Sequence, residues 1–139
     1  MLSAYPACFF KEEPGYSVIF PDLNYLSTCG DTIEDVFAMA VDCLAGYLFE
    51  AKKDGDVIPF PSALQSVSLE DVAQELELNN YQNAFVNIVT VDVEEYAKTH
   101  FNKAVKKTLT IPQWLNDSAT AAGLNFSQIL QEALMQKIK

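Results

Sequence analysis

The chain contains no arginine, one histidine and no pair of cysteines at metal-binding spacing. All nine basic residues are lysines, so bidentate pairing of a guanidinium with guanine is excluded. His100 has no cysteine at ligand spacing, and the odd set of Cys8, Cys29 and Cys43 contains no CxxC pair. With no N-terminal signal segment recognisable, these features predict free, mostly buried thiols in a reducing cytoplasm, and neither a metal site nor a cofactor.

Long hydrophobic runs are also lacking. No apolar stretch approaches the ~20 residues that a helix needs to cross a bilayer, so a membrane span is not predicted. Half of the 139 residues are nevertheless hydrophobic, which is enough for a packed core and argues against general disorder. The length suits one domain or two small ones.

The charge is strongly negative overall and unevenly distributed. The net charge is −10, but residues 1–97 contain 3 lysines and 17 acidic residues, whereas residues 98–139 contain 6 lysines and 2 acidic residues. The two parts therefore carry about −14 and +4. Opposite charges in two parts of one chain suggest two partners of opposite charge.

The N-terminal part reads as a small α+β layer. Pro14-Gly15 and Pro21-Asp22 are turn signals that separate apolar, strand-like runs. Asp31 as N-cap with Glu34 as a capping-box variant predicts a helix that keeps one apolar face until Asp54-Gly55. The predicted strands are 5–10, 16–20 and 25–29.

Residues 54–101 are expected to complete this domain. The run 83–91 is rich in Phe, Val and Ile and is the best remaining strand, while 69–78 is acidic and fits a helical turn. Asp92, with Glu95, caps a short helix that runs to about Phe101. The joint follows it, giving two predicted domains, 1–101 and 102–139.

The last 34 residues contain a strand that cannot be buried within one chain. Lys106–Ile111 alternates polar and apolar residues, and Pro112 then opens a helix that stops at Gly123. Asn125 is a good N-cap for a second helix with one apolar stripe. A strand with both edges unpaired needs a second copy. The segment resembles the ribbon-helix-helix DNA-binding domains, which dimerise through a two-stranded ribbon.

The N-terminal part is similar to the HicB antitoxin family. The similarity rests on the order and spacing of four segments: Tyr5-Pro6-Ala7, Gly15-Tyr16-Ser17-Val18, Phe20-Pro21-Asp22-Leu23 and Gly30-Asp31-Thr32-Ile33-Glu34-Asp35. After the third segment the family often has Pro-Gly-Cys, where this chain has Asn24-Tyr25-Leu26. The resemblance implies a reduced RNase H-like fold that occludes a HicA-type mRNA-cleaving toxin. It also implies a C-terminal domain that binds operator DNA and represses the pair's own operon.

In the ribbon-helix-helix reading, Lys106, Thr108 and Thr110 form the face that reads DNA. A dimer would place six such side chains in the major groove, with specificity from several weak contacts and from DNA shape. Asn125 and Ser127 would present the N-terminus of the second helix to a phosphate. The alternatives are an edge strand whose polar face meets water, and simple capping of the helix.

The acidic residues least explained by turns or caps are Glu12, Glu13, Asp42 and Glu50, which we expect to contact the toxin. A nuclease reading would need a carboxylate set such as Asp22, Asp31, Glu34 and Asp35. Each of these four has a local structural explanation, and His100 has no recognisable orienting partner. We therefore predict that the chain is not an enzyme.

The full sequence reading is a cytoplasmic, two-domain antitoxin and autorepressor. We expect a homodimer through residues 106–139, with a higher oligomer left open, on a palindromic operator. The alternative is a stand-alone ribbon-helix-helix transcriptional regulator whose acidic domain senses a ligand or another protein. The sequence leaves open the operator, the toxin's cleavage preference and the role of Trp114.

Overall fold

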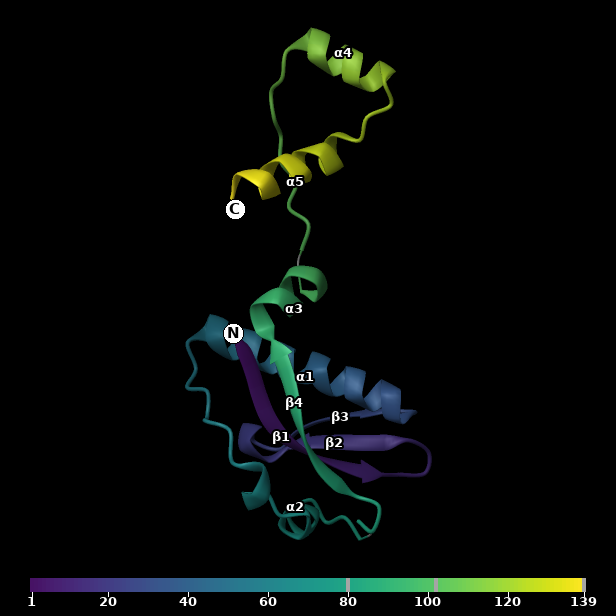
Figure 1. Ribbon diagram of the computed structural model, residues 1–139, viewed down its shortest axis with the longest axis vertical. Helices are drawn as coiled ribbons and strands as arrows, with labels where there is room; N and C mark the ends of the chain where they lie inside the picture. Colours follow the sequence, from purple (N-terminus) through teal and green to yellow (C-terminus); the bar gives the residue numbers. More distant parts are fainter. Residues whose placement is uncertain (80, 102, 139) are drawn as a thin grey trace. The chain divides into compact units, whose positions relative to one another are not determined.

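The computed structural model describes residues 1–79, 81–101 and 103–138. The chain divides into two compact units, Met1–Lys103 and Ala104–Lys139. We call them unit 1 and unit 2. Among the described residues, unit 1 contains a four-stranded sheet with three α-helices, and unit 2 contains two α-helices (Figure 1). Within the described residues, no helix is both long and apolar enough to cross a lipid bilayer.

The sheet of unit 1 is antiparallel throughout, with the strand order β3-β2-β1-β4. The long strand β1 (Leu2–Lys11) lies inside the sheet and pairs with both β2 (Tyr16–Phe20) and β4 (Phe85–Asp92). The strand β3 (Leu26–Gly30) pairs with the other side of β2. These bounds confirm the four predicted strands to within a few residues, and with them the α+β class.

One long helix, α1 (Ile33–Asp54), covers one face of the sheet (Figure 1). Its N-cap is Thr32, whose hydroxyl oxygen accepts a hydrogen bond from the Asp35 backbone N–H at 3.1 Å. The prediction that Asp31 caps this helix is therefore wrong by one residue. Threonine and aspartate are both good caps, and the register of the buried helix face decides between them. Gly55, at φ 74°, ends the helix as predicted.

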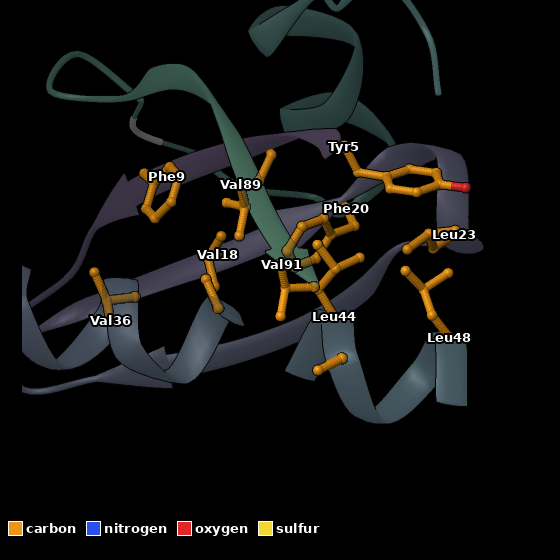
Figure 2. Packing of buried hydrophobic residues seen from close by; sticks show 13 residues of the cluster. Tyr5, Phe9, Val18, Phe20, Leu23, Val36, Leu44, Leu48, Val89 and Val91 are labelled. Carbon is orange, nitrogen blue, oxygen red and sulfur yellow. The ribbon is translucent and has the colours of Figure 1, made fainter. Parts of the chain in front are cut away.

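The main core lies between α1 and the sheet. Alternate residues of β1 point into it, and the Phe9 ring stacks on Phe37 and Phe85 with centroids 4.6 and 4.9 Å apart. Leu44 of α1 is fully buried in the same core. Figure 2 shows the buried residues of this core, Phe9 and Leu44 among them, and also shows the Tyr5 hydroxyl at the edge of the cluster, pointing away from it.

A second, smaller core covers the opposite face of the sheet. The short helix α2 (Leu69–Glu75) places Val72 and Ala73 over Cys8, Phe10 and Ile19. The 3-10 turn η2 (Leu64–Ser66) precedes this helix. The sequence predicted a helical turn here but only one covering helix for the sheet. A second layer is needed because β1 is apolar on both faces, with six consecutive buried residues.

The corner after β2 has two residues with positive φ where the HicB sequence pattern has Pro-Gly. The 3-10 turn η1 (Pro21–Leu23) is followed by Asn24 and Tyr25, both in the left-handed region at φ 56° and 59°. Glycine adopts such a φ freely, so Tyr25 keeps the backbone form that the family's glycine suits. Proline is locked near φ −65° and cannot adopt the Asn24 conformation. A proline at position 24, as in the family pattern, would therefore require a different backbone conformation at this corner.

Unit 1 ends with α3 (Val93–His100), which packs on α1. Asp92 caps α3 by accepting a hydrogen bond from the Glu95 backbone N–H at 3.2 Å, which confirms the predicted cap. Phe101, the residue that follows α3, packs on Phe49 of α1, with ring centroids 5.4 Å apart.

Unit 2 consists of α4 (Gln113–Ala121) and α5 (Phe126–Lys137). Asn125 caps α5 through the Gln128 backbone N–H at 3.1 Å, as predicted. Pro112 lies just before the first helical residue of α4, not inside its first turn.

The predicted strand Lys106–Ile111 is not formed. Residues 103–111 are all described, and none of them belongs to a strand. A strand exists only when a neighbouring segment accepts and donates its backbone hydrogen bonds. The structure contains one copy of the chain, and the sequence reading requires a second copy for this pairing.

Replacement of two glycines of unit 1 by alanine should change the free energy of unfolding in opposite directions. A Cβ at Gly30 would lie 2.5 Å from the Val36 backbone nitrogen, whereas a Cβ at Gly46 would meet only the Phe101 ring at 3.8 Å. Gly30→Ala should therefore lower the free energy of unfolding by about 2 kcal/mol. Gly46→Ala, in a helix interior, should raise it by up to about 1 kcal/mol. Urea denaturation of the two variants checks this, and wild-type stability in Gly30→Ala would contradict the packing of β3 against α1.

Candidate protein-binding and DNA-binding sites

Two of the predicted toxin-contact residues lie in the β1–β2 loop. Glu12 and Glu13 are exposed there, beside a shallow hollow that they share with Tyr81 and Asn83. The loop also lies against the end of β3, because a Cβ at Gly15 would be 2.5 Å from the Gly30 carbonyl oxygen. The loop is therefore held in place from the sheet side.

This arrangement gathers further acidic residues at the same end of the unit. Asp31 is exposed beside Gly30, and Glu34 and Asp35 are exposed in the first turn of α1. We call Glu12, Glu13, Asp31, Glu34 and Asp35 the acidic end. The sequence reading assigned the last three only to local structure, and the contact between the loop and Gly30 was not visible from the sequence.

Asp42 and Glu50, the other two predicted contact residues, lie further along α1 and differ in environment. Asp42 is half-buried, and one of its carboxylate oxygens accepts a hydrogen bond from the Tyr96 hydroxyl at 2.9 Å. Burial first, and then this carboxylate, raise the pKa of Tyr96 above its ordinary value. Asp42 therefore fastens α3 to α1. Glu50 is exposed and lies about 24 Å along the helix axis from Glu34. The four residues do not form one cluster.

A third feature of unit 1 lies after α1, where the chain runs in extended form towards α2 (Figure 1). The Tyr5 hydroxyl donates a hydrogen bond to the Pro59 carbonyl oxygen at 2.6 Å. The Asp22 carboxylate accepts hydrogen bonds from the Ser62 backbone N–H and hydroxyl at 2.7 and 2.6 Å. Asp22, which a metal site would need, is thus engaged with the protein itself.

Among the described residues, no group of three or more His, Cys, Asp or Glu side chains could hold a metal ion. His100 does have partners, which the sequence did not reveal: its ring stacks on Tyr96, and its Nδ1 lies 2.7 Å from the Thr99 hydroxyl and 3.0 Å from the Tyr96 carbonyl oxygen. Neither partner is a carboxylate, and both belong to the end of α3.

The three cysteines are free, as predicted, but differ in exposure. Cys8 is buried in the second core, and burial raises the pKa of its thiol to about 11. Cys43 is half-buried, and burial followed by the charge of Asp42 raises its pKa. Cys29 is exposed on β3, so the expectation of mostly buried thiols holds for only one of the three in full.

The predicted DNA-contact residues are all exposed in unit 2. Lys106, Thr108 and Thr110 lie in the extended segment before α4. Asn125 and Ser127 lie at the beginning of α5, where the Asn125 side chain already accepts one backbone hydrogen bond. Capping by Asn125 is therefore certain, and the remaining N–H groups of the first turn are available to an anion.

Unit 2 leaves its apolar side chains in water. No described residue between 104 and 138 is buried, and the exposed fractions of Leu109 and Trp114 reach 61% and 69%. The other large apolar side chains exposed in this unit are Val105, Ile111, Leu115, Leu124, Phe126, Ile129, Leu134, Met135 and Ile138. Apolar side chains exposed in this number are typical of a surface that another protein surface covers.

Comparison with known proteins assigns the class of this fold. A chain in a solved toxin–antitoxin complex from Streptococcus pneumoniae is 34% identical, with a TM-score of 0.66, and the match covers 99% of each chain. Antitoxin HicB 2 of Photorhabdus laumondii is 41% identical over 61 residues, which are 42% of this chain and 42% of that relative. An uncharacterized 14.9 kDa protein of Haemophilus phage HP1 is 26% identical over 112 residues, 80% of this chain and 74% of that one.

These relatives place the chain in the class of bacterial toxin–antitoxin proteins. A family model described as the HicB-like antitoxin of bacterial toxin–antitoxin systems matches residues 5–133, nearly the whole chain. The chain therefore belongs to the HicB-like antitoxin family, as the motifs of the N-terminal part predicted.

Asp42 and Glu50, both on α1, should contribute differently to stability. Asp42→Ala removes the acceptor of the Tyr96 hydroxyl and should lower the free energy of unfolding by about 1 kcal/mol. Glu50→Ala, on the exposed side, should change it by less than about 0.5 kcal/mol. In a double-mutant cycle, Tyr96→Phe should add little to Asp42→Ala, because both remove one interaction. Fully additive losses would show that the hydrogen bond contributes nothing.

Proposed function

We propose that this chain is an antitoxin that binds and occludes a HicA-type mRNA-cleaving toxin through unit 1. Unit 2 pairs with a second copy, binds operator DNA and represses the operon. The protein works in the cytoplasm. Inhibition is stoichiometric covering of the toxin's RNA-binding surface, with no catalytic step by this chain.

The observation that carries this proposal is the agreement between charge and structural unit. Unit 1 contains 5 lysines and 17 acidic residues, whereas unit 2 contains 4 lysines and 2 acidic residues. A toxin that holds RNA must offer a basic surface, and a compact acidic unit complements it. A slightly basic unit with unpaired backbone groups suits a phosphate backbone.

The proposed dimer would pair the backbone groups of residues 106–111 and cover the apolar side chains that unit 2 exposes. When residues 106–111 of two copies pair as an antiparallel ribbon, their backbone groups are satisfied and Leu109 and Ile111 turn towards the helices. The apolar side chains of α4 and α5 then have a surface to cover. A two-fold ribbon binds a palindromic operator, and pairing of such dimers into tetramers is compatible with the same contacts.

In this dimer the polar face of the ribbon reads DNA. Lys106, Thr108 and Thr110 of both copies enter the major groove, where threonine meets base edges or a thymine methyl and lysine reaches guanine or a phosphate. Asn125 and Ser127 hold the N-terminus of α5 at the backbone. Without arginine, specificity is the sum of several weak contacts and DNA shape.

A second candidate function is a stand-alone ribbon-helix-helix regulator whose acidic unit senses a ligand or another protein. It shares the DNA-binding half and differs only in the partner of unit 1. A short neighbouring reading frame that encodes a small basic protein would favour the antitoxin. Co-purification of that protein with this chain separates the two functions directly.

Toxin association should depend strongly on salt. The small basic protein encoded next to this chain should co-purify with it, and its association rate should fall about tenfold or more from low to high salt. Dissociation, which depends on the apolar centre of the interface, should change less. Stopped-flow mixing over a salt series measures both rates.

Charge-reversal variants should show which part of the chain attracts the toxin electrostatically. Glu12→Lys with Glu13→Lys should slow association, whereas Asp117→Lys with Glu132→Lys, an equal charge change in unit 2, should not. Glu50→Lys is a single-site version on the exposed side of α1, while Asp42 is left intact because of its bond to Tyr96. An association rate indifferent to salt and to all reversals would mean that the acidic residues serve solubility alone.

Operator binding should depend on the polar face of the ribbon. Lys106→Ala and Thr110→Ala should each weaken binding by about 1 kcal/mol per contact, doubled by the two-fold symmetry. Lys106→Ala should also reduce the salt dependence if this lysine meets a phosphate. Fluorescence anisotropy with the operator measures both effects, and circular dichroism should remain unchanged. Wild-type affinity in both variants would show that another surface reads the DNA.

A further inference from the structure

The segment between α1 and α2 presents one aromatic side chain to the solvent. Phe60 is 95% exposed and lies between Pro59 and Pro61. The nearby Ile58, by contrast, is half-buried against the main core. An exposed phenylalanine makes little contribution to folding. Its exposure is notable here because the backbone around it is fixed.

The backbone is fixed on both sides of Phe60. Before it, the buried Tyr5 donates its hydroxyl proton to the Pro59 carbonyl oxygen at 2.6 Å. After it, Ser62 donates two hydrogen bonds to the Asp22 carboxylate at 2.6 and 2.7 Å. The prolines restrict φ at the two adjoining positions. Four constraints on a short stretch of chain thus order the backbone that carries the exposed phenyl ring.

Such an arrangement is suited to binding. Interface energies are dominated by a few large side chains that enter well-packed pockets of the partner. A side chain whose backbone is already ordered loses less conformational freedom when it binds, so more of its burial energy appears as affinity. Phe60 needs no rearrangement of unit 1 to act in this way.

We propose that Phe60 is the apolar anchor by which unit 1 docks into a pocket of the basic toxin. The inference rests on the proposed function and adds to it the residue at the centre of the interface. The charge of unit 1 selects this partner, because its 17 acidic residues against 5 lysines repel both a nucleic acid and a second copy of unit 1. A basic protein is attracted by the same field.

The experiment uses the full chain and the small basic protein encoded next to it. Phe60→Ala should speed dissociation of the complex at least about tenfold, because a central aromatic anchor is worth that much or more. Val57→Ala is the matched control, since Val57 is 94% exposed in the same segment but lies outside the two fixed points. It should change dissociation less than about twofold. Thermal melting should be unchanged in both variants.

A second variant tests whether the fixed backbone matters. Ser62→Ala keeps the phenyl ring but removes a hydrogen bond to Asp22. It should speed dissociation by an intermediate factor, about threefold, and its effect should largely disappear in the Phe60→Ala background. Full additivity of the two changes would overturn the positioning role of the Ser62 contact.

The outcomes separate this inference from the proposed function. If the wild-type complex forms and Phe60→Ala dissociates at the wild-type rate, Phe60 is not the anchor, although the antitoxin function stands. If Phe60→Ala leaves toxin binding intact but lowers the sedimentation coefficient of the free chain, a second copy covers this residue and the inference is wrong. If the wild-type chain does not bind the neighbouring protein, the proposed function fails and the inference with it.

Discussion

The constraint on which the account depends is that unit 2 cannot bury its own apolar side chains. Between residues 104 and 138, all of which are described, none is buried, and the segment 103–111 forms no strand. Two short helices and an extended segment satisfy neither the backbone groups nor the hydrophobic surface by themselves. A second copy would satisfy both at once, and this is the basis of the dimer that we propose on a palindromic DNA site.

Unit 1, in contrast, buries its own apolar side chains. Its strand β1 is covered on both faces, by α1 on one side and by α2 on the other, so that Phe9 and Phe10 lie in different cores (Figure 1). A unit that is packed in this way keeps its surface rigid, and an interface on a rigid surface loses less entropy on binding. The acidic end and Phe60 are therefore both displayed on a scaffold that needs no partner to form.

Local signals in the sequence predicted much of this structure. Turn residues bounded the strands, and the caps at Asp92 and Asn125 followed from side chains three residues before an N–H group. Such local signals could not predict contacts between segments that are far apart in the sequence. The bond of Asp42 to Tyr96 joins residues 54 apart, and that of Asp22 to Ser62 joins residues 40 apart. The structure forms no strand at 106–111, and the strand that we propose there would need a second chain, which rules for a single chain cannot test.

Sedimentation equilibrium of the full chain and of a chain ending at Lys103 tests whether unit 2 holds two copies together. We predict that the full chain is a dimer, or a multiple of one, and that the shortened chain is a folded monomer. The prediction separates the two units because only unit 2 has surface that must be covered for the fold to be complete. A full chain that remains monomeric at high concentration, or a shortened chain that still dimerises, would contradict it.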